Sequence, residues 1–180
     1  MSKLKEKYQK KVVPEMIKEF GYKTPMAVPR ILKMVVNSGV GKTKDNKDTV
    51  LFIEKQLGLI TGQKPSARPA KKAISSFKTR KGQIIGFKVT LHGEKMYAFM
   101  ERLISLAIPR TRDFMGIPLR SVDQSGNLTF GVKEHIVLPE TTGEDVKNIF
   151  GLEVTVVTNA KTKNEAVGLF KLLGFPLQNV

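Results

Sequence analysis

A strict alternation of side chains along residues 84–92 limits the fold of this chain more than any other feature. Successive residues of a β-strand point to opposite sides. One side of this strand would carry the apolar residues Ile85, Phe87, Val89 and Leu91. The opposite side would carry Gly86, Lys88, Thr90 and His92. The pattern therefore predicts a strand in a sheet with one buried face and one face open to a partner.

The rest of the chain alternates between helical and extended patterns joined by short connections. Apolar residues at three- and four-residue steps predict helices over 2–20, 48–60 and 94–107. Pro14 is expected to divide the first helix in two and Pro109 to end the third, because proline disrupts helical hydrogen bonding. A capping box at residues 162–165 opens a last helix. Runs rich in β-branched residues predict strands over 31–37 and 152–158, and one or two strands over 128–138.

These elements predict an α+β fold with an antiparallel or mixed sheet, helices packed on one face and the other face open. The open face is expected to carry either Lys33 or Met34, together with Asn37, Lys88 and Thr90. The 180 residues are expected to form a single domain, 1–180. Two loops interrupt it: a projecting basic loop at about 70–82, and a long loop at about 110–127 that is rich in Pro, Gly, Asp and Ser.

The charges of this chain are divided unevenly along its length. The net charge of +15 lies entirely in the first 96 residues, since residues 97–180 hold nine basic and nine acidic side chains. From Lys55 to Gly93 there are 39 consecutive residues with nine Lys or Arg and no Asp or Glu. Such a segment repels itself unless a polyanion supplies the missing negative charge. With a pI near 10.0, the basic half is typical of a nucleic-acid-binding protein.

The basic loop carries one aromatic residue, Phe77, among five cations. They are Lys71, Lys72, Lys78, Arg80 and Lys81. An aromatic ring that stacks on a base, flanked by phosphate-binding cations, is a frequent composition in RNA-binding proteins. Phe77 could equally anchor the loop to the core, and the sequence leaves both interpretations open.

Other function classes receive less support. The stretch GVGKT at 39–43 resembles the end of a phosphate-binding loop, but that motif requires glycine at position 36, where Val36 stands. The two histidines, His92 and His135, have no cysteine or second histidine at a metal-ligand spacing, and no nucleophile stands beside a base. We therefore expect no enzyme, cofactor, metal or small-molecule substrate.

A peripheral membrane protein remains an alternative, because anionic lipid also attracts cations. No segment approaches the ~18 apolar residues of a membrane span.

Several blocks of the sequence match a known family in order and spacing. They include VPRI at 28–31, VVNSGVG at 35–41, ITGQKP at 60–65, AKKAI at 70–74, IGFKVTL at 85–91, PRTRDF at 109–114 and GVKE at 131–134. Through these blocks the chain resembles, nearly end to end, the bacterial large-subunit ribosomal protein five, the 5S-rRNA-binding protein of the central protuberance.

The resemblance implies a structural protein of the large ribosomal subunit that contacts large-subunit rRNA and three further partners. The open sheet face would bind 5S rRNA through Lys33, Asn37, Gln63, Lys64, Lys88, Thr90 and His92. The basic loop would reach the P-site tRNA through Lys71, Lys72, Phe77, Lys78, Arg80 and Lys81. Residues 110–144 would face the small-subunit head and form an intersubunit bridge with its protein thirteen through Arg110, Arg112 and Arg120. The expected location is a cytoplasmic ribosome, with an organelle ribosome left open and no membrane contact.

The chain also departs from the family pattern. Arginines that the family usually carries are absent at Met115, Ser125 and Phe150. Because methionine, serine and phenylalanine cannot replace the bidentate contacts of arginine, we expect a thinner intersubunit bridge than usual.

Overall fold

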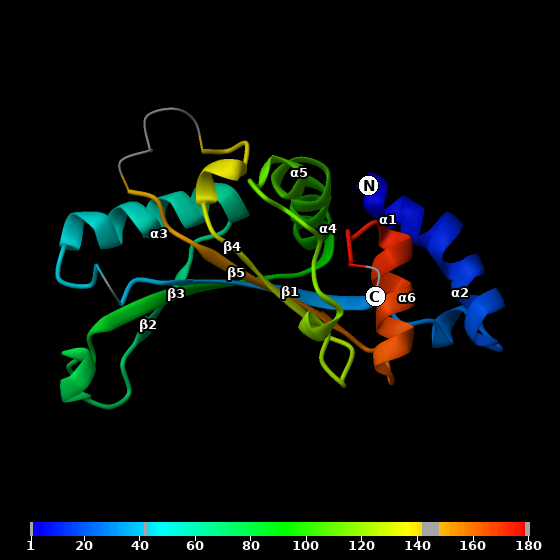
Figure 1. Ribbon diagram of the computed structural model, residues 1–180, viewed down its shortest axis with the longest axis horizontal. Coiled ribbons are helices and arrows are strands. Elements are labelled where there is room, and N and C mark those ends of the chain that lie inside the picture. The colour runs from blue at the N-terminus through cyan, green and yellow to red at the C-terminus, as the bar shows by residue number, and fades with distance from the viewer. Residues whose placement is uncertain (1, 42, 142–147, 179–180) are drawn as a thin grey trace.

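The computed structural model describes residues 2–41, 43–141 and 148–178, and its centre is a five-stranded antiparallel sheet (Figure 1). The strands are β1 Ile31–Gly39, β2 Ser66–Pro69, β3 Ile84–Leu91, β4 Leu128–Val132 and β5 Leu152–Thr158. They follow the order β2-β3-β1-β5-β4, so β1 lies in the middle, between β3 and β5. Together with the helices this confirms the predicted α+β class.

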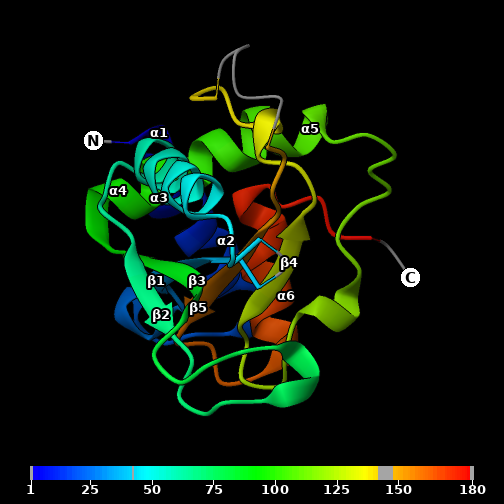
Figure 2. The ribbon, with the colours of Figure 1, turned by 90° about the vertical axis from the view of Figure 1, so that its left-hand side faces the viewer.

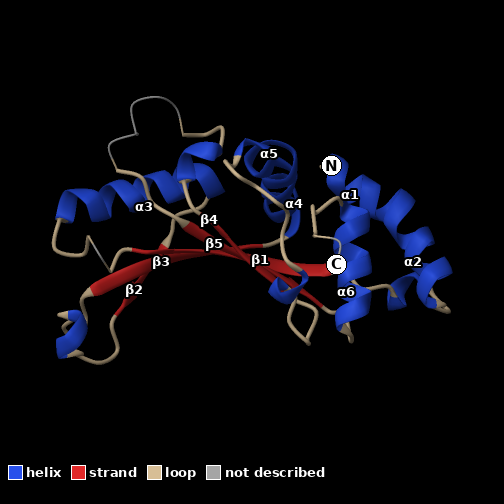
Figure 3. Cartoon of the chain, viewed as in Figure 1, coloured by secondary structure: helices blue, strands red, loops and turns tan. Residues whose placement is uncertain are grey.

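Helices pack along one side of the sheet and at one of its ends. They are α1 Lys3–Lys7, α2 Val13–Phe20, α3 Lys47–Thr61, α4 Gly93–Arg102, α5 Ile108–Arg110 and α6 Lys163–Leu173. Figure 3 shows α3, α4 and α5 along one side of the strands, and α1, α2 and α6 grouped at the end where β1 begins. This arrangement agrees with the predicted sheet that is covered by helices on one face.

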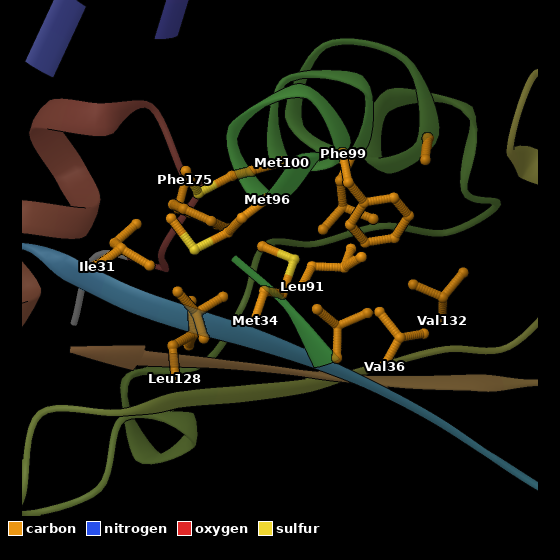
Figure 4. Close-up of a cluster of buried hydrophobic side chains, with 14 of the residues drawn as sticks. Ile31, Met34, Val36, Leu91, Met96, Phe99, Met100, Leu128, Val132 and Phe175 are labelled. Atoms are coloured by element: carbon orange, nitrogen blue, oxygen red, sulfur yellow. The ribbon is translucent and has the colours of Figure 1, made fainter. Parts of the chain in front are cut away.

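The hydrophobic core fills the space between the sheet and the helices. Figure 4 shows Met34 of β1 and Leu91 of β3 beneath Met96 and Phe99 of α4. Each of these four side chains is at most 1% exposed. Since Met34 belongs to this core, the neighbouring Lys33 is the residue that β1 presents on the opposite face.

Of the two predictions about prolines in helices, one is confirmed in part and one is wrong. Pro14 lies in the first turn of a second α-helix, α2, but a π-helical stretch at Tyr8–Val12 joins α2 to α1 without a break. Pro109 does not end the third helix, because a π-helical stretch at Leu103–Ala107 leads from α4 into α5. Proline lacks the amide N–H of the regular helical pattern, and the wider π turn before each proline accommodates that loss.

Most helix and strand ends follow local signals in the sequence. The side chain of Asn46 caps α3 by accepting hydrogen bonds from the amides of Asp48 and Thr49, at 3.1 and 3.2 Å. Gly62 ends the same helix in a left-handed conformation, with φ of 64°. The segment 128–138 contains one strand, β4, followed by a 3-10 turn at His135–Val137.

Candidate nucleic-acid interface

The face of the sheet opposite the core presents one continuous row of polar residues. The register aligns Asn37 of β1 with Lys88 of β3 on one side and with Glu153 of β5 on the other. The row continues to Ser66 of β2 beyond Lys88 and to Gly131 of β4 beyond Glu153. Along β1, β3 and β5 these residues lie between buried ones, and all five remain partly or fully exposed. The sheet therefore fixes amide, ammonium, hydroxyl and carboxylate groups side by side.

A second row on the same face consists mainly of threonines. Val35 of β1 lies between Thr90 of β3 and Thr155 of β5, and Thr129 of β4 extends the row. The hydroxyls of Thr129 and Thr155 are 3.1 Å apart and share a hydrogen bond. The side chains of this row are short and all four are partly exposed, which leaves the face accessible to a large partner.

The residues predicted to bind 5S rRNA are distributed between this face and its edge. Lys33, Asn37, Lys88 and Thr90 lie on the strands and point away from the core. The side-chain amide of Gln63 donates to the carbonyl of Thr90 at 3.3 Å, which ties the end of α3 to the sheet.

Lys64 and His92 lie outside the strands and complete the predicted set. Lys64 is exposed in the connection from α3 to β2, and His92 is exposed at the N-terminus of α4. The register that aligns Val35 with Thr90 brings His92 and Lys33 to the same end of the sheet. The predicted residues therefore follow one surface, running from the edge of β3 onto β1.

The basic loop forms the tip of the hairpin between β2 and β3. Ala70 exchanges backbone hydrogen bonds with Gln83 and Gly82 at its base, at 2.8 and 2.9 Å. A bridge between Ile74 and Thr79 closes the tip around a 3-10 turn. Residues 71–78 are all exposed. Figure 2 and Figure 1 show this hairpin tip, residues 70–82, extending beyond the sheet on the side away from α3.

Phe77 at the hairpin tip is not a core anchor. Its side chain is 70% exposed, and its carbonyl accepts a hydrogen bond from the Nζ of Lys44. The ring lines a groove of about 1210 Å³ between the hairpin tip and the body of the protein. Ile74 and Ile149, each about half exposed, also line this groove. Of the two interpretations of Phe77, the structure therefore favours a surface residue.

The cations of the acid-free segment have no ionic partner within the part of the chain that the structure describes. None of the nine Lys and Arg side chains between Lys55 and Gly93 forms an ion pair with a described carboxylate. Elsewhere the chain does pair its charges: Lys5 lies 3.1 Å from Glu94 and lowers the pKa of that carboxyl through a hydrogen bond. The positive charge of this segment thus remains available to an external anion.

The residues predicted for the intersubunit bridge are exposed on the other half of the molecule. Arg110 is the last residue of α5 rather than part of a loop, which corrects its predicted place. Arg112 follows it in a turn, and Arg120 lies in a 3-10 turn at Leu119–Ser121. Between them Met115 is 85% exposed. The end of the predicted bridge region, residues 142–144, lies outside the described residues.

The geometry gives no support to the alternatives. β1 ends at Gly39 and α3 begins only at Lys47, so 39–43 does not lead directly into a helix as a phosphate-binding loop does; Lys42 lies outside the described residues. Over residues 2–41, 43–141 and 148–178, no three His, Cys, Asp or Glu side chains come together to hold a metal ion. In the same ranges no helix is long and apolar enough to cross a membrane.

Comparison with protein families identifies both halves of the chain. Residues 24–80 match the family described as ribosomal protein L5, and residues 84–177 match the family described as the C-terminus of that ribosomal protein. The chain belongs to the ribosomal protein L5 family. It is therefore a structural constituent of the large ribosomal subunit and not an enzyme, which confirms the resemblance seen in the sequence.

Relatives match over nearly the whole chain. Large ribosomal subunit protein uL5 of Dictyoglomus turgidum is 50% identical over 178 residues, covering 99% of both chains. The protein of the same name from Malacoplasma penetrans is 50% identical over 175 residues, covering 97% of this chain and 94% of that one. The one from Thermoanaerobacter is 47% identical over 176 residues and 98% of both chains. Because these relatives are bacterial, the L5-family chain is a protein of the cytoplasmic ribosome.

Sequence reasoning missed several residues of the open face. Ser66 and Arg68 of β2, and Glu153 and Thr155 of β5, share the face with Asn37. The alternation in LEVTVVT at 152–158 already places Glu153 and Thr155 on one side of a strand. It does not reveal which strand lies beside them, and that neighbour decides whether they join the face.

Proposed function

We propose that the open face of the sheet binds 5S rRNA. The observation that carries this proposal is the register, which aligns Asn37 with Lys88 and Val35 with Thr90 on a face left exposed. A regular sheet holds such side chains at fixed spacing. Folded RNA is recognised by shape together with phosphate and polar contacts, and a rigid polar surface suits that kind of recognition.

On this face, one set of residues contacts phosphates and a second set forms hydrogen bonds that fix the position of the RNA. Lys33, Lys64 and Lys88 contact phosphates and provide most of the affinity. Asn37, Gln63 and Thr90 provide hydrogen bonds that fix the position of the RNA, and His92 contacts it at the edge. The absence of described ionic partners for Lys64 and Lys88 supports this division, because neither cation must first leave an internal carboxylate.

The hairpin tip, residues 70–82, contacts the P-site tRNA. Its support is the exposure of residues 71–78 and the reach of the tip beyond the sheet. Five cations on the tip contact the tRNA backbone, and Phe77 offers a ring for stacking: the cations are Lys71, Lys72, Lys78, Arg80 and Lys81.

Arg110, Arg112 and Arg120 contact protein thirteen of the small-subunit head and form part of an intersubunit bridge. All three arginines are exposed, and they lie in the half of the chain whose charges balance. A surface of this kind suits a protein partner better than RNA, with guanidinium groups donating to carboxylates or amides.

Binding of purified 5S rRNA tests the central proposal. Replacing Asn37 and Lys88 together by alanine should weaken binding at 100 mM salt by about tenfold or more. Lys171→Ala, on the exposed surface of α6, serves as the control and should bind as the unmodified protein does. Equal affinities for the double variant and the control would contradict the proposed face.

A further inference from the structure

A shallow hollow of about 420 Å³ lies on the open face where β1 ends and β5 begins. Gly39, Gly131 and Gly151 line it together with Asn37, Lys133 and Glu153. Its residues come from β1, from β4 and the residue after it, and from β5 and the residue before it. The hollow thus exists only because these three strands lie side by side.

Two glycines keep this hollow open. A Cβ atom added at Gly39 or at Gly131 would meet no atom within 4 Å, so the space next to each is empty. Neither glycine has a positive φ, so the backbone does not require glycine at these positions. The missing side chains leave an accessible floor of backbone, which leaves room for a planar ring.

The side of the hollow carries a hydrogen-bond donor beside an acceptor. The side-chain amide of Asn37 lies 3.5 Å from the carboxylate of Glu153, which is its cross-strand partner. Glu153 is the one carboxylate among the strand residues of the open face, and it forms no ion pair with a described cation. On a surface that meets RNA, an exposed carboxylate repels phosphates. It becomes favourable only where the RNA offers donors, which are base N–H groups and 2′-hydroxyls.

We propose that this hollow binds one unpaired guanine of the RNA, with Glu153 and Asn37 reading its Watson–Crick edge. The carboxylate of Glu153 accepts from N1–H and N2–H, and the amide of Asn37 donates to O6. Guanine alone among the four bases presents an acceptor followed by two donors along that edge; adenine and cytosine begin with a donor, and uracil ends with an acceptor. Lys88, beside Asn37, and Lys133, at the hollow, contact the flanking phosphates. The inference rests on the proposed binding of 5S rRNA by the open face.

Chemical probing of 5S rRNA tests directly whether Glu153 and Asn37 bind a guanine. Kethoxal adds across N1 and N2 of an unpaired guanine, the same two atoms that Glu153 would cover. Saturating wild-type protein should protect one guanine from kethoxal. Glu153→Gln and Gly131→Val, each also added to saturation, should leave that guanine reactive, the first by removing an acceptor and the second by filling the hollow. Lys171→Ala, on the exposed surface of α6, is the control and should protect it as wild type does.

Affinity gives a second readout. Glu153→Gln should bind 5S rRNA about tenfold more weakly, the expected loss for one bidentate base contact. Gly131→Val should bind with a similar loss while keeping the thermal midpoint of the wild type, since the added side chain points into open space. If Gly131→Val unfolds, Glu153→Gln still decides the matter, because it changes neither size nor backbone.

The outcomes separate this inference from the function on which it rests. If the wild type fails to bind 5S rRNA, or if Lys88→Ala binds it as tightly as the wild type does, the proposed face is wrong. The guanine site is then wrong as well. If the face binds but no guanine is protected, or both variants protect the same guanine, only the guanine site is wrong. Protection of an adenine or cytosine from dimethyl sulfate that both variants abolish would likewise contradict recognition of guanine.

Discussion

The open face of the sheet and the hairpin tip both present cations without internal partners, but they are held in different ways. Lys88 lies on β3 between two paired strands, and its neighbour Asn37 is fixed by the register. Residues 71–78 at the tip are all exposed, and one bridge, one 3-10 turn and the hydrogen bond from Lys44 to the Phe77 carbonyl hold them in place. A fixed array can recognise the shape of one RNA, whereas an exposed tip mainly contributes charge. Under the proposed function, the same charge therefore serves two kinds of contact.

The largest expected effect concerns the basic half as a whole. If six or more cations of the first 96 residues, outside the hairpin tip, contact phosphates of 5S rRNA, the affinity should fall on the order of 10³-fold or more between 50 and 200 mM salt. Titrations at several salt concentrations measure this slope. An affinity nearly independent of salt would mean that the cations serve another purpose.

Truncating side chains on the two faces of β1 should change the stability of the fold by very different amounts. Met34→Ala removes a fully buried side chain and should lower the free energy of unfolding by about 2–5 kcal/mol. Lys33→Ala, one residue away on the exposed face, should change that free energy by less than about 0.5 kcal/mol. Urea unfolding of both variants measures the difference. Similar losses in the two variants would mean that the assignment of the faces is wrong.

Polar contacts on the sheet should matter for 5S rRNA more than charges on the tip. Asn37→Ala combined with Thr90→Val should weaken 5S binding by about tenfold, since each contact contributes roughly 0.5–1.5 kcal/mol. Both side chains are partly exposed, so the fold should remain intact. Filter binding measures the affinity, and circular dichroism checks the fold.

The hairpin tip should show the reverse pattern. Alanine at Lys71, Lys72, Lys78, Arg80 and Lys81 should weaken P-site tRNA binding to ribosomes while the 5S affinity falls by less than about tenfold. The salt slope for 5S binding should also stay unchanged, because the slope falls by about one for every phosphate that a cation no longer neutralises. Equal losses of 5S affinity in the tip variant and the Asn37–Thr90 variant would contradict the division between sheet and tip.

The smallest effect is expected in the neutral half. Alanine at Arg110, Arg112 and Arg120 should weaken subunit association by less than about tenfold, because exposed charged contacts are individually weak. Crosslinking from position 112 in assembled ribosomes identifies the partner. Products with large-subunit RNA alone, and none with a small-subunit protein, would contradict the proposed bridge.

Much of the fold was predictable because it depends on local patterns. The alternation at residues 84–92 predicted which face of β3 enters the core, and Phe87, Val89 and Leu91 are all buried. Ile85, at the start of the same face, is instead 36% exposed and lines the groove beside the hairpin tip. The capping box predicted the start of α6, where the hydroxyl of Thr162 accepts from the amide of Glu165 at 3.3 Å. The continuation of the helix through Pro109, and the junction of α1 with α2 before Pro14, were missed because a π turn leaves no signal in residue type.

By itself, the sequence determined the α+β class, the basic half and the family, since each follows from residue types along one segment or from their order. It also determined that Asn37 and Lys88 lie on polar faces of strands. Only the tertiary structure decided that β5 lies beside β1, and with it that Glu153 stands next to Asn37 above a hollow floored by glycines. The physical reason is that strand alternation is set by neighbours in the chain, whereas strand pairing joins residues more than a hundred positions apart.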